Sequence, residues 1–426
     1  MKTYAKQKLS TWSLALGLSL SSLGTFGGPI PVEVKETDGI AYLLRAEEPY
    51  FIKGAGGNHD LERLAAIGGN SIRTWGLTDE GILDEAHRHG LTVCAGLWIE
   101  HERHGFDYGD KAAVAEQIRR HKETVDRFKD HPAILLWGIG NEVELEASDP
   151  RVWDVVEAVA AYIKEVDPHH PTMTVTAHVE GAVVEEILRR CPSIDILGSN
   201  SYGGIGILAE AIEESNWKGP HIVTEWGNDG AWEVDRTAWG AEIEPTSTEK
   251  AGDFALRYSA ISGERRCLGG YAFHWGYKQE TTPTWFNIFL EDGSATEIVE
   301  VLQYLWTGKF PEVLAPRIAA MRINGEEAAS SLKLSPGKKA VADFILTRAS
   351  PVEVRVHWEL LRESEDKGVG GDPEERPASV HFDTVGASAT HLEFTVPEKS
   401  GPYRLFLYVR GDGGTAATAN FPFYVK

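Results

Sequence analysis

The chain has 426 residues and a formal net charge of -22 at pH 7, from 42 basic and 64 acidic side chains. This acidic balance is a poor match for nucleic acid, anionic polymers and membrane surfaces, and it favours a neutral partner. A chain of this length is too long for a single hydrophobic core of ordinary size, which predicts two domains. The three cysteines are an odd number, so they cannot all be paired in disulfides within the chain.

The N-terminal residues 1–26 have the layout of a secretory signal peptide. Three lysines precede the apolar stretch Trp12–Leu23, and small residues follow it. The apolar stretch is too short to span a bilayer comfortably. We therefore expect a secreted or periplasmic protein with no integral membrane segment once the signal is removed. Residues 27–49 are expected to form a hairpin-containing extension that plugs the floor of the next domain.

From residue 50 to residue 308 the sequence alternates between short apolar strands and amphipathic helices. Eight such units match the size of a (β/α)8 barrel, which is our fold prediction. An open doubly wound sheet would carry a phosphate-binding loop, and the glycines 54, 56 and 57 lack that spacing. The expected strands are 51–55, 71–75, 91–99, the run after Pro132, 172–177, 194–199, 221–225 and 270–274. The expected helices are 61–67, 78–88, 111–129, 150–166, 181–190, 207–215, 249–262 and 295–306.

Residues 309–426 change character. Helical periodicity gives way to short alternating segments such as 352–356 and 403–409, and turn-rich spacers separate them, the longest being 365–375. This pattern predicts a β-sandwich of immunoglobulin or fibronectin type. We favour a role in packing against the barrel over a role in glycan binding.

Two glutamates end two of the predicted barrel strands. The apolar run after Pro132 ends in Asn141-Glu142, and the strand 221–225 ends in Glu225. Strands four and seven of a barrel face each other across its mouth, so the two carboxylates can converge there. Paired carboxylates carry out glycoside cleavage: one protonates the leaving oxygen, and the other attacks the anomeric carbon or activates water. Their separation decides between retention and inversion, and the sequence does not measure it.

The segments 137–142 and 223–227 resemble the clan A retaining glycoside hydrolases, especially the barrel domain of family 2. The resemblance covers the barrel, and it implies Glu142 as the acid/base and Glu225 as the nucleophile. It also implies four further site residues: Asn141 binding the sugar 2-hydroxyl, Arg73 and Tyr202 contacting the nucleophile, and Trp275 as the aromatic floor of the sugar subsite.

Further side chains at strand ends are candidates for substrate contact. Trp75, Trp98 and Trp226, like Trp275, fall at or just past strand ends, where an indole stacks on a sugar or packs in the core. His178 ends strand five and either contacts the substrate or caps the strand. Asn200, at the end of strand six, completes the predicted substrate-binding set with Trp98 and His178.

No metal and no cofactor is expected. In the loop 100–104 the two histidines are three residues apart, which does not fit a zinc-binding helix, so we expect this loop to form a polar wall. The segments 51–54 and 70–73 also resemble the opening of family 72 glucanosyltransferases. The sequence thus predicts a secreted retaining β-glycosidase acting on an oligo- or polysaccharide, with β-glucan favoured. A transglycosylase and a non-catalytic carbohydrate-binding barrel are the alternatives.

Overall fold

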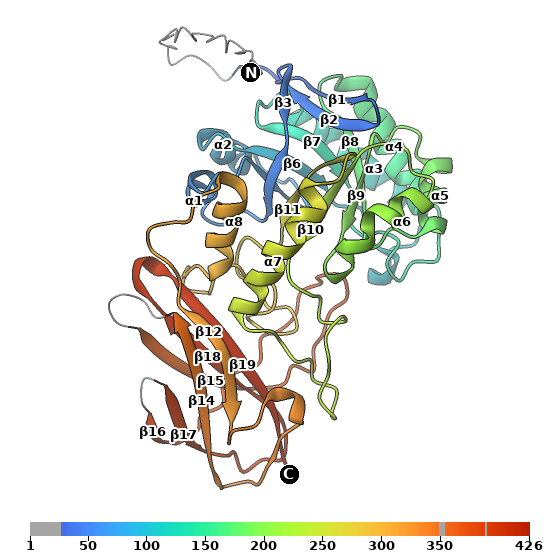
Figure 1. The fold of residues 1–426 in the computed structure, drawn as a ribbon. Helices are drawn as coiled ribbons and strands as arrows, with labels where there is room; N and C mark the ends of the chain where they lie inside the picture. The colour runs from blue at the N-terminus through green and yellow to red at the C-terminus, as the bar shows by residue number, and fades with distance from the viewer. Residues whose placement is uncertain (1–26, 349–353, 388–389) are drawn as a thin grey trace, which may run out of the picture.

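The structure is a computed structural model that describes residues 27–348, 354–387 and 390–426. The predicted signal peptide, residues 1–26, lies outside the described residues. A small N-terminal sheet, a barrel and a strand-rich domain follow one another along the chain (Figure 1).

Eight parallel strands close into a barrel in the order β10-β11-β4-β5-β6-β7-β8-β9. Seven of them are buried at every residue, which explains their near-continuous apolar sequences. The predicted (β/α)8 barrel is therefore confirmed. The strands are β4 (Ile52–Gly56), β5 (Ser71–Arg73), β6 (Thr92–Leu97), β7 (Ile134–Ile139), β8 (Thr172–Thr176), β9 (Ile196–Asn200), β10 (His221–Trp226) and β11 (Cys267–Ala272).

A helix follows each barrel strand, and the sequence specifies several of the helix starts. Asp110 accepts hydrogen bonds from two backbone N–H groups at the start of one helix, and Thr246 and Glu249 form a capping box at another. The helices are α1 (Leu61–Ala66), α2 (Gly81–Arg88), α3 (Lys111–Phe128), α4 (Val152–Val166), α5 (Gly181–Arg190), α6 (Leu208–Glu214), α7 (Ser247–Ser262) and α8 (Glu297–Thr307). Short 3-10 turns, η1 (Glu102–His104) and η2 (Gly203–Ile207), lie in the loops after β6 and β9.

The strands β1 (Val32–Thr37), β2 (Ile40–Arg45) and β3 (Glu48–Tyr50) form an antiparallel sheet at the end of the barrel opposite the sandwich (Figure 1). Val32 and Leu43 from this sheet share one apolar cluster with residues of the barrel interior. The N-terminal extension thus covers the amino ends of the barrel strands and leaves the carboxyl ends for the site.

The C-terminal domain consists of two four-stranded sheets with the orders β12-β14-β17-β16 and β13-β19-β18-β15. Inward-facing side chains of both sheets form one buried cluster, as the predicted β-sandwich requires. The strands are β12 (Arg317–Ile323), β13 (Lys333–Leu334), β14 (Lys339–Arg348), β15 (Arg355–Arg362), β16 (Thr384–Ala387), β17 (His391–Thr395), β18 (Gly401–Arg410) and β19 (Ala416–Val425), with the turns η3 (Ala328–Ser330) and η4 (Asp412–Gly414).

Buried polar contacts join the sandwich to the barrel. Glu244 of the barrel pairs with Lys250 at 2.5 Å and accepts a hydrogen bond of 2.6 Å from Asn420 on β19. Arg404 on β18 donates to the backbone carbonyl of Glu242 at 2.7 Å. All of these side chains are buried. The sandwich therefore packs against the barrel, as we favoured from the sequence.

Candidate active site

The backbone turns sharply where β7 ends. Gly140 and Glu142 both have positive φ angles, +77° and +51°. A positive φ is unusual for a glutamate and costs free energy that the surrounding fold must supply. The backbone N–H of Glu142 donates to the carbonyl of Val175 on β8 at 2.9 Å, which fixes the turn. Asn141 and Glu142 are thereby held at the mouth of the barrel, where both side chains are almost fully buried.

Three donors surround the carboxylate of Glu225 at the end of β10. Arg73 and the indole N–H of Trp75 donate to Oε1 at 2.8 and 2.9 Å, and the hydroxyl of Tyr202 donates to Oε2 at 2.7 Å. Burial and the charge of Glu225 raise the pKa of Tyr202 well above its usual value, so its hydroxyl stays a donor. The three bonds stabilise negative charge on Glu225 and fix its orientation.

A network of amides links the two glutamates. The side-chain NH2 of Asn200 donates to Glu142 Oε1 at 2.7 Å and contacts Asn141 Oδ1 at 3.2 Å. Arg73 donates its second nitrogen to Asn141 Oδ1 at 2.6 Å. Thr224 donates to Asn200 Oδ1 at 2.8 Å, which sets the orientation of that amide. The acid/base candidate, the nucleophile candidate and the amide between them therefore form one rigid unit.

The two carboxyl groups differ in their surroundings. Burial, followed by the nearby charge of Glu225, raises the pKa of Glu142 to about 8. Among the described residues, the Glu142 carboxyl group accepts one side-chain hydrogen bond, from Asn200, whereas that of Glu225 accepts three, one of them from a guanidinium. Near neutral pH the raised pKa thus keeps a proton on Glu142. One acid and one nucleophile side by side can cleave a glycosidic bond.

Both glutamates line one cavity of about 720 Å3 at the mouth of the barrel. This volume lies in the range of pockets that bury a small ligand. Aromatic side chains on its wall provide faces for sugar rings. The aromatic and histidine residues of the wall are Trp75, Trp98, His178, Tyr202, Trp232, Phe273 and His274.

The structure brings most of the predicted site residues together. Asn141, Glu142, Tyr202, Glu225, Trp98 and His178 line the cavity. Arg73 and Asn200 lie beneath it, in contact with the two glutamates through the bonds described above.

Trp275 does not line the cavity, so its prediction as the aromatic floor was wrong, and Trp226 takes the core position that the sequence left open. The side chain of Trp275 is fully buried, donates its N–H to the carbonyl of His59, and packs edge-on against Phe289 at 4.8 Å between ring centroids. After β11 the chain turns so that Phe273 and His274 face the cavity instead. Trp226 is also core, packed on Phe254 at 5.0 Å.

Two aromatic contributions were missed from the sequence. Trp232, in the long loop after β10, has 55% of its surface exposed and lies edge-on to Tyr202 at 5.6 Å. A large exposed indole in a loop that follows the nucleophile strand is a signal that could have found it. Trp75 was expected either to stack on a sugar or to pack in the core, and its N–H contact with Glu225 depends on geometry that the sequence does not reveal.

Every lysine and arginine on the described cavity wall is already paired. Lys278 pairs with Glu280 at 2.6 Å, while Lys367 and Arg236 pair with Glu242 at 2.5 and 3.3 Å. Burial lowers the pKa of the wall residue His274 to about 3, so this imidazole is neutral. The wall thus presents neutral donors and acceptors and carboxylates, which suits hydroxyl groups better than an anionic ligand.

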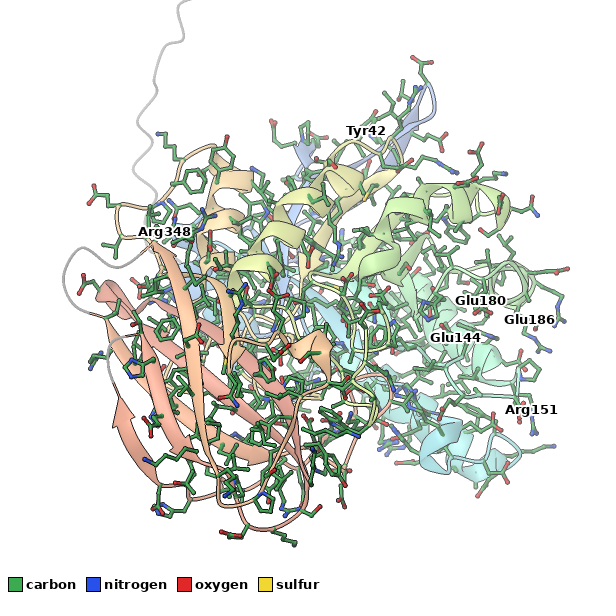
Figure 2. The ribbon with its side chains drawn as sticks, turned by 60° about the horizontal axis from the view of Figure 1, so that its bottom comes forward. Tyr42, Glu144, Arg151, Glu180, Glu186 and Arg348 are labelled. Carbon is green, nitrogen blue, oxygen red and sulfur yellow. The ribbon has the colours of Figure 1, made fainter. Side chains whose placement is uncertain are left out.

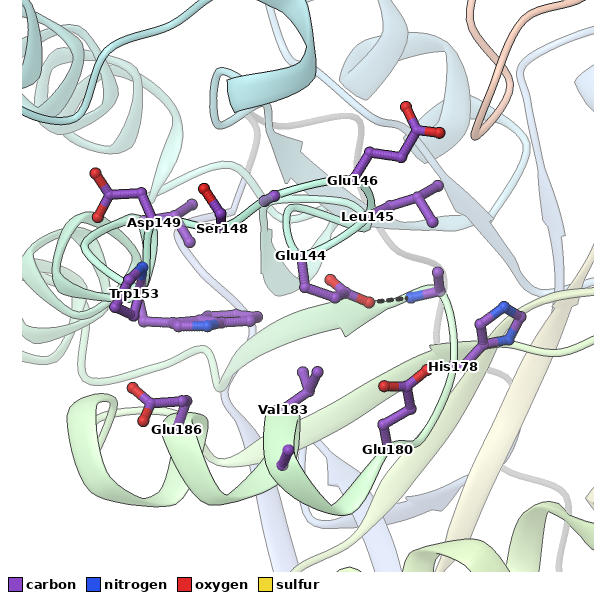
Figure 3. A pocket seen from close by; sticks show the side chains of 15 residues that line it. Glu144, Leu145, Glu146, Ser148, Asp149, Trp153, His178, Glu180, Val183 and Glu186 are labelled. Carbon is purple, nitrogen blue, oxygen red and sulfur yellow. Dashed lines mark hydrogen bonds between the residues drawn. The ribbon is translucent and has the colours of Figure 1, made fainter.

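A second cavity of about 420 Å3 adjoins the first and shares Leu145, Ala177 and His178 with it. Figure 3 shows Glu144 pointing into its centre, where the carboxylate accepts a hydrogen bond of 2.6 Å from the backbone N–H of Ala177. Glu180 and Glu186 lie on the same edge of the barrel as Glu144, far from Arg348 at the sandwich (Figure 2). The second cavity is therefore an acidic extension on the acid/base side of the site.

The loop 100–104 packs behind the cavity, and none of its residues lines it, so the expected polar wall was wrong. The ring of His101 stacks on Trp98 at 4.7 Å, and burial followed by the charge of Arg103 lowers the pKa of His101 to about 3. Within residues 27–348, 354–387 and 390–426, no group of three His, Cys, Asp or Glu side chains is arranged to hold a metal ion. None of the helices formed by these residues is long and apolar enough to cross a membrane.

Comparison with known families supports the resemblance predicted from the sequence. Residues 59–232 match the family described as "Glycosyl hydrolases family 2, TIM barrel domain". The beta-glucuronidase of Pongo abelii is 26% identical over 147 residues, which are 34% of this chain and 21% of that protein. The beta-glucuronidase of Mus musculus is 26% identical over 194 residues, 40% of this chain and 27% of that protein. The match thus spans about a quarter or less of these relatives.

Solved structures show the same fold. A mutant of Bacteroides uniformis beta-glucuronidase 2 aligns with a TM-score of 0.51 and 14% identity over 91% of this chain and 47% of that one. The Bifidobacterium dentium beta-glucuronidase complexed with coumarin-3-O-glucuronide aligns with a TM-score of 0.52 and 18% identity over 66% of this chain and 49% of that one.

Proposed function

We propose that this chain, whose barrel is of the glycosyl hydrolase family 2 type, is a secreted retaining β-glycosidase that acts on a neutral β-linked glycan, with β-glucan favoured. The observation that carries the proposal is that Glu142 and Glu225 line one cavity, with a raised pKa on Glu142 and three hydrogen-bond donors on Glu225. A secreted location is consistent with the signal-like segment at residues 1–26.

The proposed reaction is a double displacement. A carboxylate oxygen of Glu225 attacks the anomeric carbon, while Glu142 gives its proton to the departing glycosidic oxygen. The bond to the leaving group breaks and a glycosyl ester with Glu225 forms. Glu142, now ionised, takes a proton from water as the water attacks the same carbon, which releases the sugar and restores both carboxyl groups.

The choice of a neutral sugar rests on the charges of the wall. The relatives are named beta-glucuronidases, and a uronide carries a carboxylate that needs a cation. The wall residues described above offer three cations, each paired with a carboxylate, and two of them share Glu242. A uronide would have to displace one of these ion pairs, whereas hydroxyl groups can donate to the carboxylates that are present. A uronide is the second candidate substrate, favoured by the relatives.

A panel of aryl β-glycosides tests the proposal and ranks the two substrates. We expect turnover of the β-glucoside with net retention, and a kcat/KM for the glucuronide at least about tenfold lower. Glu225→Ala should abolish turnover, and a small anion such as azide should restore it with an inverted product. A higher rate on the glucuronide would refute the neutral substrate, and absence of turnover in the wild type on every glycoside would indicate a binding protein.

The acidic second cavity supports a substrate longer than one sugar. Val183 on α5 lines this cavity, whereas its helix neighbour Glu185 does not. Val183→Trp should fill the cavity and lower kcat/KM on an oligosaccharide about tenfold while an aryl glycoside is unaffected. Glu185→Trp is the matched control and should change neither rate. Product analysis with and without an acceptor sugar distinguishes hydrolysis from transfer to that sugar.

A further inference from the structure

A loop of the sandwich domain forms one side of the cavity. Residues 367–371 and Glu374 line it together with barrel residues, although they lie between β15 and β16 of the other domain. In Figure 1 the chain that joins these strands runs from the sandwich to the mouth of the barrel. We call residues 367–374 the wall loop.

The wall loop is attached to the barrel at both ends. Asp372 pairs with Arg103 at 3.2 Å and with His104 at 2.8 Å. The carboxylate of Glu374 accepts a hydrogen bond of 2.7 Å from the backbone N–H of Thr281. At the other end of the loop, Lys367 pairs with Glu242 at 2.5 Å. The carbonyl of Gly371, next to Asp372, accepts from Lys278 at 3.2 Å. The position of the loop is thus specified by several charged contacts across the domain boundary.

The wall loop lies directly against the oxygen of Glu142 that is free to carry a proton. Glu142 Oε1 is occupied by Asn200, which leaves Oε2 for the leaving group. A β-carbon added at Gly370 would lie 2.9 Å from Glu142 Oε2, 2.9 Å from Leu145 and 3.0 Å from Arg103. A side chain here would crowd Glu142, and a φ of +61° adds backbone strain for any residue other than glycine.

We propose that the wall loop bounds the leaving-group side of the active site and restricts the size of the leaving group, with Asp372 and Glu374 holding it in place. This proposal rests on the proposed function, since it assigns a leaving group to Glu142. A leaving oxygen must approach Glu142 Oε2, so the group attached to that oxygen meets the backbone at Gly370. The sandwich domain therefore acts as a determinant of specificity for the barrel.

Two pairs of variants test the proposal in opposite directions. The readout is the ratio of kcat/KM on an oligosaccharide to kcat/KM on an aryl glycoside of the same sugar. Asp372→Ala and Glu374→Ala release the loop, and we expect each to raise the ratio about tenfold. Gly370→Ala adds a methyl group against Glu142 and should lower the ratio by a similar factor. Because both substrates are measured on one preparation, loss of folded protein cancels.

Matched controls isolate the effect. Glu375→Ala changes an exposed carboxylate just beyond the loop and should leave the ratio unchanged. Gly371→Ala has a comparable backbone cost, with φ at +77°. Its β-carbon would meet the flexible ends of Lys278 at 3.3 Å and Glu280 at 3.9 Å, so the ratio should change less than in Gly370→Ala. If the wild type is active but the ratio is unchanged in the Asp372, Glu374 and Gly370 variants, the proposed role of the wall loop is refuted and the proposed function stands. If the wild type shows no turnover, both the proposed function and the proposed role of the wall loop are refuted.

Discussion

The pH dependence of catalysis should follow the proton on Glu142. Its raised pKa, about 8, leaves about nine tenths of the molecules protonated at pH 7. With the ordinary value of a glutamate, fewer than about one in a hundred would be protonated at that pH. The protonated form of Glu142 is the acid of the first step. We therefore expect loss of this proton to have little effect on kcat/KM up to about pH 7. Above about pH 8 it should fall tenfold per pH unit.

The assay is kcat/KM on an aryl glycoside with a poor leaving group, measured from pH 5 to pH 10. A matched substrate with a strongly activated leaving group is the control, because its departing oxygen needs no proton. Glu142→Gln should lower kcat/KM on the poor leaving group by about a hundredfold or more and barely change the activated one. A basic limb centred near pH 5 would refute our account of Glu142, as would an equal loss on both substrates.

Three further outcomes follow from buried groups. The raised pKa of Glu142 makes the folded state lose stability as pH rises from about 4.5 through about 8. Glu142→Gln should therefore stabilise the protein at pH 8 by about 4 kcal/mol in urea unfolding and flatten that dependence. Tyr202→Phe keeps the ring but removes a donor to Glu225, so kcat should fall about tenfold to a hundredfold with KM little changed, and an unchanged kcat would contradict this role. Lys250→Met leaves Glu244 unpaired at the domain boundary and should cost about 3–5 kcal/mol of unfolding free energy, whereas a cost below about 1 kcal/mol would show that the pair is not needed.

The barrel was predictable because parallel strands buried on both faces have continuous apolar sequences that turn polar where they leave the core. This rule predicts from the sequence alone that Glu142 and Glu225 lie at the mouth of the barrel. It failed locally at the eighth strand, which begins at Cys267, three residues earlier than expected. Gly269 and Gly270 interrupt the apolar pattern there because a β-carbon at Gly269 would collide with the backbone of Ile52.

The site was predictable only where its residues end strands. Trp275 also follows a strand, but the turn after β11 directs it into the core, and the sequence does not show the direction of a turn. The wall loop was read only as a turn-rich spacer. Its contact between Arg103 and Asp372 joins residues 269 positions apart, so no local pattern marks it. Contacts between side chains that are far apart in the sequence, such as this one, cannot be predicted from local sequence patterns.

The wall loop also has a consequence for biosynthesis. During translation the barrel, residues 50–308, is synthesised before residues 367–374, and domains tend to fold as they emerge from the ribosome. A nascent barrel would hold both glutamates yet lack one boundary of its pocket. During translation the acid/base would be open to bulky acceptors, and selectivity would arise only when the second domain has docked.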